Sequence, residues 1–271
     1  MPKINANGLT MNFDQQGSGE PLVLIPYLAA DHTCYAFQVA EYAKYFTCIS
    51  LDLRGTGETD KPDGVYTTEL LADDVAAFMH AAGIRKAHIA GLSLGAAVGM
   101  WLAVKYPENV ATLSLHGGWP TTDAFIRTVV EAWQITARAV GVPEMIIRGI
   151  FPWCFSPELY AARPDYIESL AAFVRSRPEP SVSDFIQQSN AVMAHDVEME
   201  LSRIAAPTLM TFGRYDLLTS TRFAPRLTSA IRNSEVLVFE GCAHAPLYED
   251  VEAFNQKTLA FLHRHAGAPA V

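Results

Sequence analysis

The fold is decided by the stretch AHIAGLSLGAAVGM, residues 87–100, in which Ser93 stands between two apolar runs. The run before the serine has the pattern of a buried strand and the run after it that of a helix, so Ser93 occupies a sharp turn. Gly91 and Gly95 lie two residues to either side. Such a turn lifts a hydroxyl clear of the sheet, and glycines remove the Cβ atoms that would clash there. The pattern predicts a nucleophilic serine, the plain alternative being a serine that caps a helix.

Strand-like and helix-like segments alternate along most of the chain, which is typical of a parallel sheet with crossover helices on its faces. The segment PLVLIP, residues 21–26, is a continuous apolar run, as expected for a strand buried on both sides. We predict an α/β fold with a mostly parallel sheet flanked by helices. The expected strands are residues 4–9, 11–15, 21–26, 47–53, 87–92, 111–116, 207–213 and 235–241, and the expected helices are residues 35–44, 68–82, 94–106, 221–230 and 251–263.

One long block interrupts this alternation. Residues 119–201 are helical in pattern, aromatic and punctuated by proline, with no convincing strand. The block follows the sixth expected strand, and the alternation resumes after it. We therefore predict a helical cap of residues 119–201 inserted into a core made of residues 1–118 and 202–271.

Composition and charge narrow the class of protein. Half of the 271 residues are apolar, which is enough for a large buried core, and the formal net charge is −9. The acidic balance and the lack of a lysine-rich or arginine-rich run argue against nucleic acid or a membrane as the partner. Four widely spaced cysteines suggest neither a zinc site nor a disulfide scaffold, and the N-terminus lacks a signal-peptide pattern. We expect a cytoplasmic protein and allow for a homodimer.

A serine nucleophile needs a base, and the base needs an acid that orients it. His244 is the best-placed base, because it follows the last expected strand in a short loop at the same edge of the sheet as Ser93. Asp216, just past the strand 207–213, is the expected acid, and Asp123, after the preceding strand, is the alternative. Of the other histidines, His80 and His88 lie inside expected elements, His263 and His265 lie near the C-terminus, and His32, His116 and His195 could face the pocket.

The order Ser93, Asp216, His244 resembles that of the α/β-hydrolase superfamily. The stretch LDLRGTGETDKP, residues 51–62, is similar to the superfamily's Asp-x-Arg-Gly-x-Gly turn, whose aspartate and arginine we expect to be structural. Within the superfamily the chain resembles capped serine hydrolases, namely 3-oxoadipate enol-lactonases, aminoacrylate hydrolases and related esterases. The resemblance implies an α/β-hydrolase fold with the cap inserted after the sixth strand, the three residues as a catalytic triad, and no metal or organic cofactor.

Acyl transfer also needs donors for the oxyanion that develops on the carbonyl oxygen. The backbone N–H of Leu94, directly after the nucleophile, is one expected donor. The other is the N–H of Leu28, in the loop that follows the strand 21–26. Relatives carry His-Gly where this chain has Pro26-Tyr27, so we expect the loop to differ in shape while the donor position survives.

A pocket between the cap and the sheet is expected to hold the substrate. Most aromatic residues of the cap block should form the cap's own core, and a few should reach this pocket. All six basic residues of the block are arginines, and one of them could clamp a substrate carboxylate, although surface ion pairs are the ordinary alternative. The candidates to line the pocket are Tyr27, His32, Trp119, Trp133 and Trp153.

These residues predict a serine hydrolase that cleaves a small carboxylic ester or lactone, with Ser93 as nucleophile, His244 as base and Asp216 as orienting acid. The expected partner is therefore a small-molecule ester or lactone. Hydrolysis of a C–C bond, or of a C–N bond of the enamine or amide type, by the same triad is the first alternative. The second is a ligand-binding receptor with slow turnover, because a fold does not guarantee a function.

Overall fold

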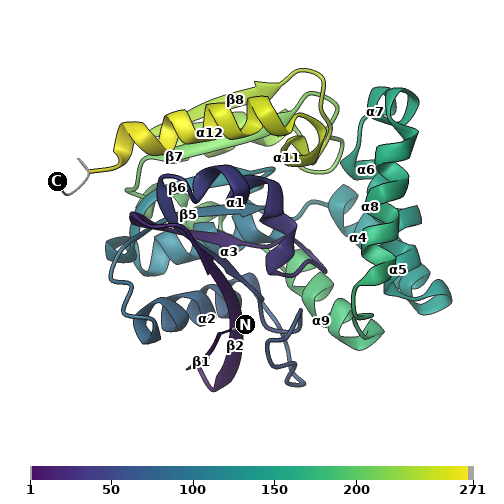
Figure 1. Cartoon of the computed structure of the whole chain (residues 1–271), viewed down its shortest axis with the longest axis horizontal. Helices are drawn as coiled ribbons and strands as arrows, with labels where there is room; N and C mark the ends of the chain where they lie inside the picture. Colours follow the sequence, from purple (N-terminus) through teal and green to yellow (C-terminus); the bar gives the residue numbers. More distant parts are fainter. Residues whose placement is uncertain (1, 268–271) are drawn as a thin grey trace.

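The computed structural model describes residues 2–267, whose strands form an eight-stranded sheet in the order β1-β2-β4-β3-β5-β6-β7-β8 (Figure 1). Strands β3 to β8 run parallel to one another, and β1 and β2 are antiparallel at one edge. The strands are β1 (Lys3–Ala6), β2 (Leu9–Gln16), β3 (Glu20–Ile25), β4 (Phe46–Leu51), β5 (Ala87–Leu92), β6 (Val110–His116), β7 (Thr208–Gly213) and β8 (Ser234–Phe239). This confirms the predicted α/β fold with a mostly parallel sheet.

Helices flank the sheet and fill the insertion. The helices of the core are α1 (Ala36–Tyr42), α2 (Thr68–Ala81), α3 (Leu94–Lys105), α10 (Ala224–Ala230), α11 (Pro246–Glu249) and α12 (Val251–His265), with 3₁₀ turns η1 (His32–Tyr35), η2 (Pro107–Asn109), η4 (Glu198–Arg203) and η5 (Thr221–Phe223). The inserted helices are α4 (Ala124–Val140), α5 (Val142–Met145), the π-helical turn η3 (Ile146–Ile150), α6 (Phe151–Cys154), α7 (Pro157–Ala162), α8 (Pro164–Ser176) and α9 (Val182–Met193). None of the helices within residues 2–267 has the length and apolar character needed to cross a bilayer.

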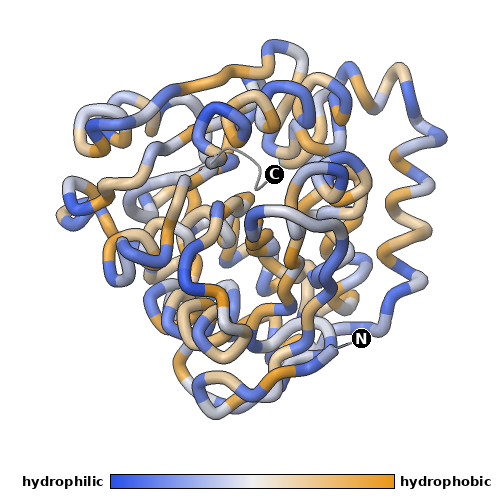
Figure 2. Tube along the Cα trace, turned by 60° about the vertical axis from the view of Figure 1, so that its left-hand side comes forward, coloured by the Kyte–Doolittle hydropathy of each residue, from blue (hydrophilic) through white to orange (hydrophobic). Residues whose placement is uncertain are grey.

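The central strands are buried on both sides, and alternate residues of one strand enter different cores. In β3, Val23 and Ile25 belong to a core shared with α2 and α3, whereas Leu22 and Leu24 belong to a core shared with α1 and α12. Successive side chains of a strand point to opposite faces, so a continuous apolar run fills both cores. In Figure 2 the hydrophobic segments accordingly gather toward the middle of the molecule.

The insertion leaves the core after β6 and returns before β7, and its helices α4 to α8 gather at the right of Figure 1. A bridge between Thr121 and Asp196 joins its two ends. Thr122 strengthens this neck, because its hydroxyl donates to the carbonyl oxygen of Val192 (2.6 Å) and accepts from the indole N–H of Trp119 (2.8 Å). The predicted insertion after the sixth strand is confirmed. The exact domain bounds stay a prediction, and residues 1 and 268–271 of the predicted core lie outside the described residues.

The prediction of the first strand as residues 4–9 is wrong at its end. Strand β1 stops at Ala6, and Asn7 and Gly8 follow with φ of 49° and 74°. These left-handed values belong to a two-residue hairpin turn, for which Asn-Gly is a favoured sequence. Elsewhere the expected ends differ by one or two residues, or a 3₁₀ turn replaces the first turn of a helix.

Candidate active site

Ser93 occupies a strained turn between β5 and α3. Its φ and ψ are 53° and −116°, and its N–H donates to the carbonyl oxygen of His116 (2.8 Å). A Cβ on Gly91 would lie 2.3 Å from the carbonyl carbon of Gly95, and a Cβ on Gly95 would lie 2.1 Å from the carbonyl oxygen of Ile25. Both flanking glycines are therefore required because backbone segments meet around the serine. Positive φ at a residue with a side chain costs free energy and is concentrated at functional sites.

Asp216 and His244 form a buried hydrogen-bonded pair. Asp216 Oδ2 lies 2.9 Å from His244 Nδ1, and the side chains are 0% and 5% exposed. The N–H groups of Leu218 (2.8 Å) and Thr219 (3.0 Å) donate to Asp216 Oδ1. Burial raises the pKa of Asp216, but the neighbouring His244 and these N–H donors outweigh it, so the pKa lies below its ordinary value. Asp216 is therefore ionised at neutral pH and can hold the proton of His244 on Nδ1.

Thr219 is a member of this group that the sequence interpretation missed. Its hydroxyl lies 3.1 Å from both Asp216 Oδ2 and His244 Nδ1. A Cβ on Gly117 would lie 2.9 Å from His244 Cε1 and 3.0 Å from Thr219 Oγ1. The Thr219 hydroxyl thus contacts both members of the pair, and the missing side chain of Gly117 leaves room for it beside the ring. The signal in the sequence was a threonine three residues after the aspartate, a spacing typical of a local side-chain cap.

Ser93 and His244 line the same cavity, which has a volume of about 710 Å³ and lies between the sheet and the inserted helices. Their loops follow β5 and β8, so the carboxyl edge of the parallel sheet brings them together. The alternative acid Asp123 caps α4 and pairs with Arg222 (3.1 Å), and Asp216 holds the histidine instead. The cavity volume falls in the range of small-molecule sites.

The two expected oxyanion donors, the N–H groups of Leu28 and Leu94, stay a prediction, and the structure shows only their surroundings. Leu94 is the first residue of α3, whose N–H the helix does not use, and Leu28 lines the cavity. Among residues 2–267, neither N–H has a protein acceptor. The left-handed residue of the Leu28 loop is Ala29, with φ of 62°, and not Tyr27. The strain falls two residues after Tyr27, at Ala29, whose N–H donates to Gln188 Oε1 (3.3 Å), and the expected difference in loop shape from the relatives stays a prediction.

Tyr27 lines the cavity and belongs to a chain of hydroxyl groups. Its hydroxyl lies 3.0 Å from that of Tyr248, which donates to the carbonyl oxygen of Cys34 (2.6 Å). Because a carbonyl only accepts, the single proton of Tyr248 is committed to Cys34, so Tyr27 donates to Tyr248. Burial raises the pKa of Tyr27 well above its ordinary value. Tyr27 therefore stays neutral and offers the cavity an acceptor only.

His32 also lines the cavity and forms a second aspartate–histidine pair. Its Nδ1 lies 2.8 Å from Asp52 Oδ1. The hydrogen bond with Asp52 raises the pKa of His32. The predicted structural arginine of the same turn, Arg54, donates two hydrogen bonds of 2.7 Å to Asp74 of α2.

Asp31, His32 and Asp52 have the spacing of a metal site, but their bonding does not suit one. Asp52 Oδ1 accepts from the N–H and Nδ1 of His32, and Oδ2 accepts from Asn12 Nδ2 and the N–H of Glu58. A carboxylate has about four lone-pair sites, so that of Asp52 is saturated. The Nδ1 of His32 carries a proton toward Asp52 and is not free to bind a cation.

The three tryptophan candidates differ in position. Trp119 and Trp133 line the cavity, and the indole N–H of Trp133 donates to the carbonyl oxygen of Gly149 in the π-helical turn (2.8 Å). Trp153 is not among the described residues that line it. Its ring packs edge-on against Phe125, with centroids 6.0 Å apart. The expectation for Trp153 is therefore wrong, because this short helix turns Cys154 toward the cavity instead.

His116 and His195 do not line the cavity. His116 Nδ1 pairs with Thr211 Oγ1 (2.8 Å), and His195 lies between Thr68 Oγ1 (2.9 Å) and the carbonyl oxygen of Trp119 (3.1 Å). Burial lowers the pKa of His116 to about 3 and that of His195 to about 4. Both are neutral structural residues.

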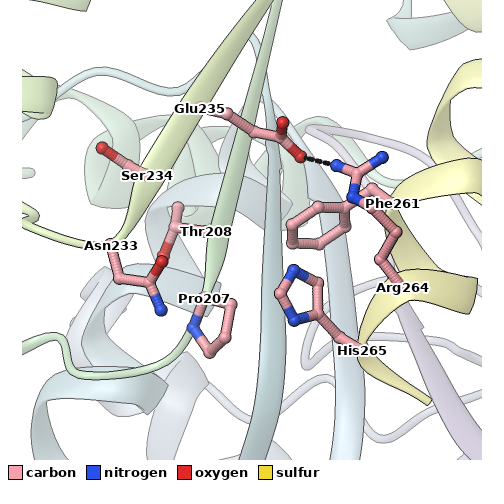
Figure 3. Close-up of a pocket in the computed structure, with 8 residues that line it drawn as sticks. All are labelled: Pro207, Thr208, Asn233, Ser234, Glu235, Phe261, Arg264 and His265. Atoms are coloured by element: carbon pink, nitrogen blue, oxygen red, sulfur yellow. Dashed lines mark hydrogen bonds and ion pairs between the residues drawn. The ribbon is translucent and has the colours of Figure 1, made fainter.

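A second, smaller cavity lies at the opposite edge of the sheet (Figure 3). It has a volume of about 170 Å³ and is bordered by Thr208 and Ser234, the first residues of β7 and β8. The side chains of Glu235 and Arg264 form an ion pair across it. No nucleophile and base are paired among its lining residues, so the chemistry belongs to the larger cavity.

Comparisons with known proteins identify the family and the fold. The sequence profile of the family described as alpha/beta hydrolase fold matches residues 5–251. The chain is 26% identical to the putative carbamate hydrolase RutD of Azorhizobium caulinodans, covering 96% of this chain and 98% of that protein. It is also 26% identical to 3-oxoadipate enol-lactonase 2 of Acinetobacter baylyi, with 96% of each covered. A thermophilic esterase from Thermogutta terrifontis has the same fold, with a TM-score of 0.87, 24% identity and coverage of 98% and 99%.

Proposed function

We propose that this chain, which belongs to the alpha/beta hydrolase fold family, is a serine hydrolase that cleaves a small carboxylic ester or lactone through an acyl-enzyme on Ser93. The observation that carries the proposal is the 2.9 Å contact between Asp216 and His244, in a cavity that Ser93 and His244 line together. The similarity to an enol-lactonase supports the ester or lactone class.

In the first step His244 Nε2 takes the proton of Ser93, whose oxygen attacks the substrate carbonyl carbon. Asp216 holds the other ring nitrogen protonated and stabilises the imidazolium that forms. The N–H groups of Leu28 and Leu94 donate to the oxyanion, and each such donor contributes about 10²–10³ in turnover. His244 then protonates the leaving alcohol, and the acyl group remains on Ser93.

In the second step a water molecule attacks the acyl-enzyme. His244 takes a proton from this water and returns it to the oxygen of Ser93, which releases the carboxylic acid. His244 accepts and donates the proton in each transfer of the cycle, and the triad and the two backbone donors are the only groups of the chain that these steps use.

Hydrolysis of a C–N bond is the second candidate, favoured by the similarity to putative carbamate hydrolases. The triad is the same for both bonds, and the leaving group differs. An alcohol leaves more readily than an amine, so the two candidates are separated by substrates and not by residues.

The proposal is tested with a matched panel of p-nitrophenyl esters, lactones, carbamates and vinylogous ketoacids. We expect the highest kcat/KM on an ester or lactone. The substitution Ser93→Ala should lower kcat by about 10⁴–10⁶ while circular dichroism and the melting temperature stay near those of the wild type. Wild-type turnover in that variant would exclude Ser93 as the nucleophile, and a preference for carbamates would replace the ester by the C–N candidate.

A further inference from the structure

The His32–Asp52 pair presents a free ring nitrogen to the reaction cavity. The side chain of His32 is 9% exposed, and its Nδ1 is held by Asp52. Within the described residues His32 Nε2 has no protein partner, and His32 lines the cavity. Asp52 holds Nδ1 as the protonated nitrogen, and its hydrogen bond raises the pKa of His32, which favours the cationic ring in which Nε2 is also a donor.

A second pair, Asp31 and Arg177, lies beside it, and here too an aspartate holds a basic side chain that lines the cavity. Asp31 Oδ1 accepts from the N–H and hydroxyl of Thr33, and Oδ2 accepts from Arg177 Nε (3.1 Å) and Nη2 (2.5 Å). Arg177 follows α8 and lines the cavity, and it is the one arginine of the predicted cap that does so among the described residues. Its Nη1 donors have no protein acceptor within residues 2–267.

The hydrogen bonds of these pairs decide what kind of group can bind there. All four lone-pair sites of Asp31 and of Asp52 are already used by protein donors. The polar atoms that remain free are the guanidinium N–H donors of Arg177 and Nε2 of His32, which is a donor when the ring is cationic. The other acids that border the cavity, Glu58 and Glu179, are solvent-exposed, and Glu58 pairs with Lys3 (3.3 Å), so their charges are screened. This end of the cavity therefore suits an anionic acceptor.

The sheet order sets the distance from this end to the nucleophile. Asp52 follows β4 and Ser93 follows β5, with β3 between them, while Asp216 and His244 follow β7 and β8 on the other side. Neighbouring strands are ~4.8 Å apart, so the two strand ends are separated by ~10 Å along the sheet edge. The His32–Asp52 pair and the Asp216–His244 pair thus lie on opposite sides of Ser93.

We propose that His32 and Arg177 form a carboxylate-binding subsite, which selects esters with an apolar body and an anionic group about 10 Å from the scissile carbonyl. The proposal rests on the proposed hydrolase function and names its substrate class. The apolar body would lie along side chains such as Ile146, Phe151 and Leu170, which line the same cavity. Asp52 and Asp31 act as positioning residues, because they orient the two donors.

The test compares mono-p-nitrophenyl esters of adipic, suberic and sebacic acid with p-nitrophenyl alkanoates of equal length. The readout is the ratio of kcat/KM between the carboxylate-terminated and methyl-terminated members of each pair. We expect this ratio to exceed one and to be larger for suberate and sebacate than for adipate, because the shorter chain cannot span the distance. A ratio below one at every length would overturn the proposal.

Two variants assign the effect to the named residues. In His32→Asn the amide can still donate to Asp52 while Nε2 is removed, and in Arg177→Gln the guanidinium is removed. Each should lower the ratio about 10- to 100-fold, the range expected for a lost hydrogen bond to a charged group. The control is Arg148→Gln, since Arg148 is an exposed cap arginine that pairs with Glu144. An unchanged ratio in both cavity variants contradicts the subsite.

Binding to the Ser93→Ala protein separates this proposal from the hydrolase proposal. Titration calorimetry with suberate and octanoate needs no turnover. Tighter binding of suberate, lost when His32→Asn is added, supports the subsite even if no ester in the panel is hydrolysed. Equal binding of the two acids overturns the subsite even if esters are hydrolysed.

Discussion

At the scale of single residues, backbone strain is concentrated where the oxyanion would sit. Ser93 and Ala29 both have positive φ, and each adjoins one of the proposed donors, Leu94 and Leu28. Strained residues of this kind persist only when their surroundings hold them, at a cost of about 1–3 kcal/mol each. At Ser93 the close packing of the backbone around Gly91 and Gly95 supplies that constraint. At Ala29 the hydrogen bond from its N–H to Gln188 contributes to it.

The substitution Ala29→Gly tests this strain. Glycine removes the strain of a left-handed alanine, which costs about 1–2 kcal/mol. The greater freedom of glycine in the unfolded chain opposes this gain by about 0.4–1 kcal/mol. We expect the free energy of unfolding to stay the same or to rise by up to about 1 kcal/mol, measured by urea denaturation. The matched control Ala30→Gly, where φ is not positive, should destabilise the protein by about 0.5–1 kcal/mol. Equal losses in both variants would refute strain at Ala29.

At the scale of elements, close backbone packing fixes how α3 sits against β3 and β5. The substitution Gly95→Ala would place a Cβ 2.1 Å from the carbonyl oxygen of Ile25, the last residue of β3, which accepts a hydrogen bond from the buried Tyr35 hydroxyl (2.9 Å). We expect a loss of about 2–4 kcal/mol in the free energy of unfolding, as for other overpacked sites.

The control for this prediction is Gly241→Ala. Gly241 has open space around its Cβ position, and its φ is not positive. The same substitution there should leave the free energy of unfolding unchanged or raise it slightly, because alanine lowers the conformational entropy of the unfolded chain. A comparable loss at both positions would mean that contact with Ile25 is not the cause.

The elements near Ser93 could be predicted from the sequence because their apolar runs differ clearly in period. Strand β5 has the expected bounds, and α3 ends one residue early. The π-helical turn Ile146–Ile150 could not be predicted, since its extra residue per turn depends on packing and leaves no hydropathy pattern. The exclusion of Trp153 from the cavity has the same origin, because the direction of a side chain on a four-residue helix is set by its neighbours.

At the scale of the whole molecule, the contact between Asp216 and His244 could be predicted from the sequence because the topology of the sheet determines it. Parallel strands bring all their carboxyl ends to one edge, so chain order indicated that Asp216 and His244 meet at the edge where Ser93 lies, and Ser93 and His244 line one cavity there. Thr219 and the His32–Asp52 pair were not predicted as partners. Such contacts depend on side-chain rotamers and on loops that no periodicity describes.

Two buried histidines predict how stability depends on pH. The pKa of His116 is lowered to about 3 and that of His195 to about 4, below the value of about 6.5 in an unfolded chain. The unfolded state therefore binds more protons below pH ~6.5, and stability falls as pH drops from ~6.5 to ~4. Each histidine contributes a slope of about 1.4 kcal/mol per pH unit, partly opposed by His32, whose pKa is raised.

Urea denaturation at pH 7 and at pH 5 measures this slope. The substitution His116→Asn, which keeps a side-chain nitrogen near Thr211, should lower the slope of stability against pH by up to about 1.4 kcal/mol per pH unit, the contribution of one proton. A wild-type protein equally stable at both pH values would show that these histidines are not held neutral in the folded state.

The central claim, that Ser93 is a nucleophile activated by His244, is tested most directly by a fluorophosphonate probe with mass-spectrometric location of the adduct. We predict one adduct, on Ser93, formed promptly in the wild type, abolished in Ser93→Ala and slowed by orders of magnitude in His244→Ala. Absence of an adduct, or labelling at equal rates with and without His244, would contradict the claim.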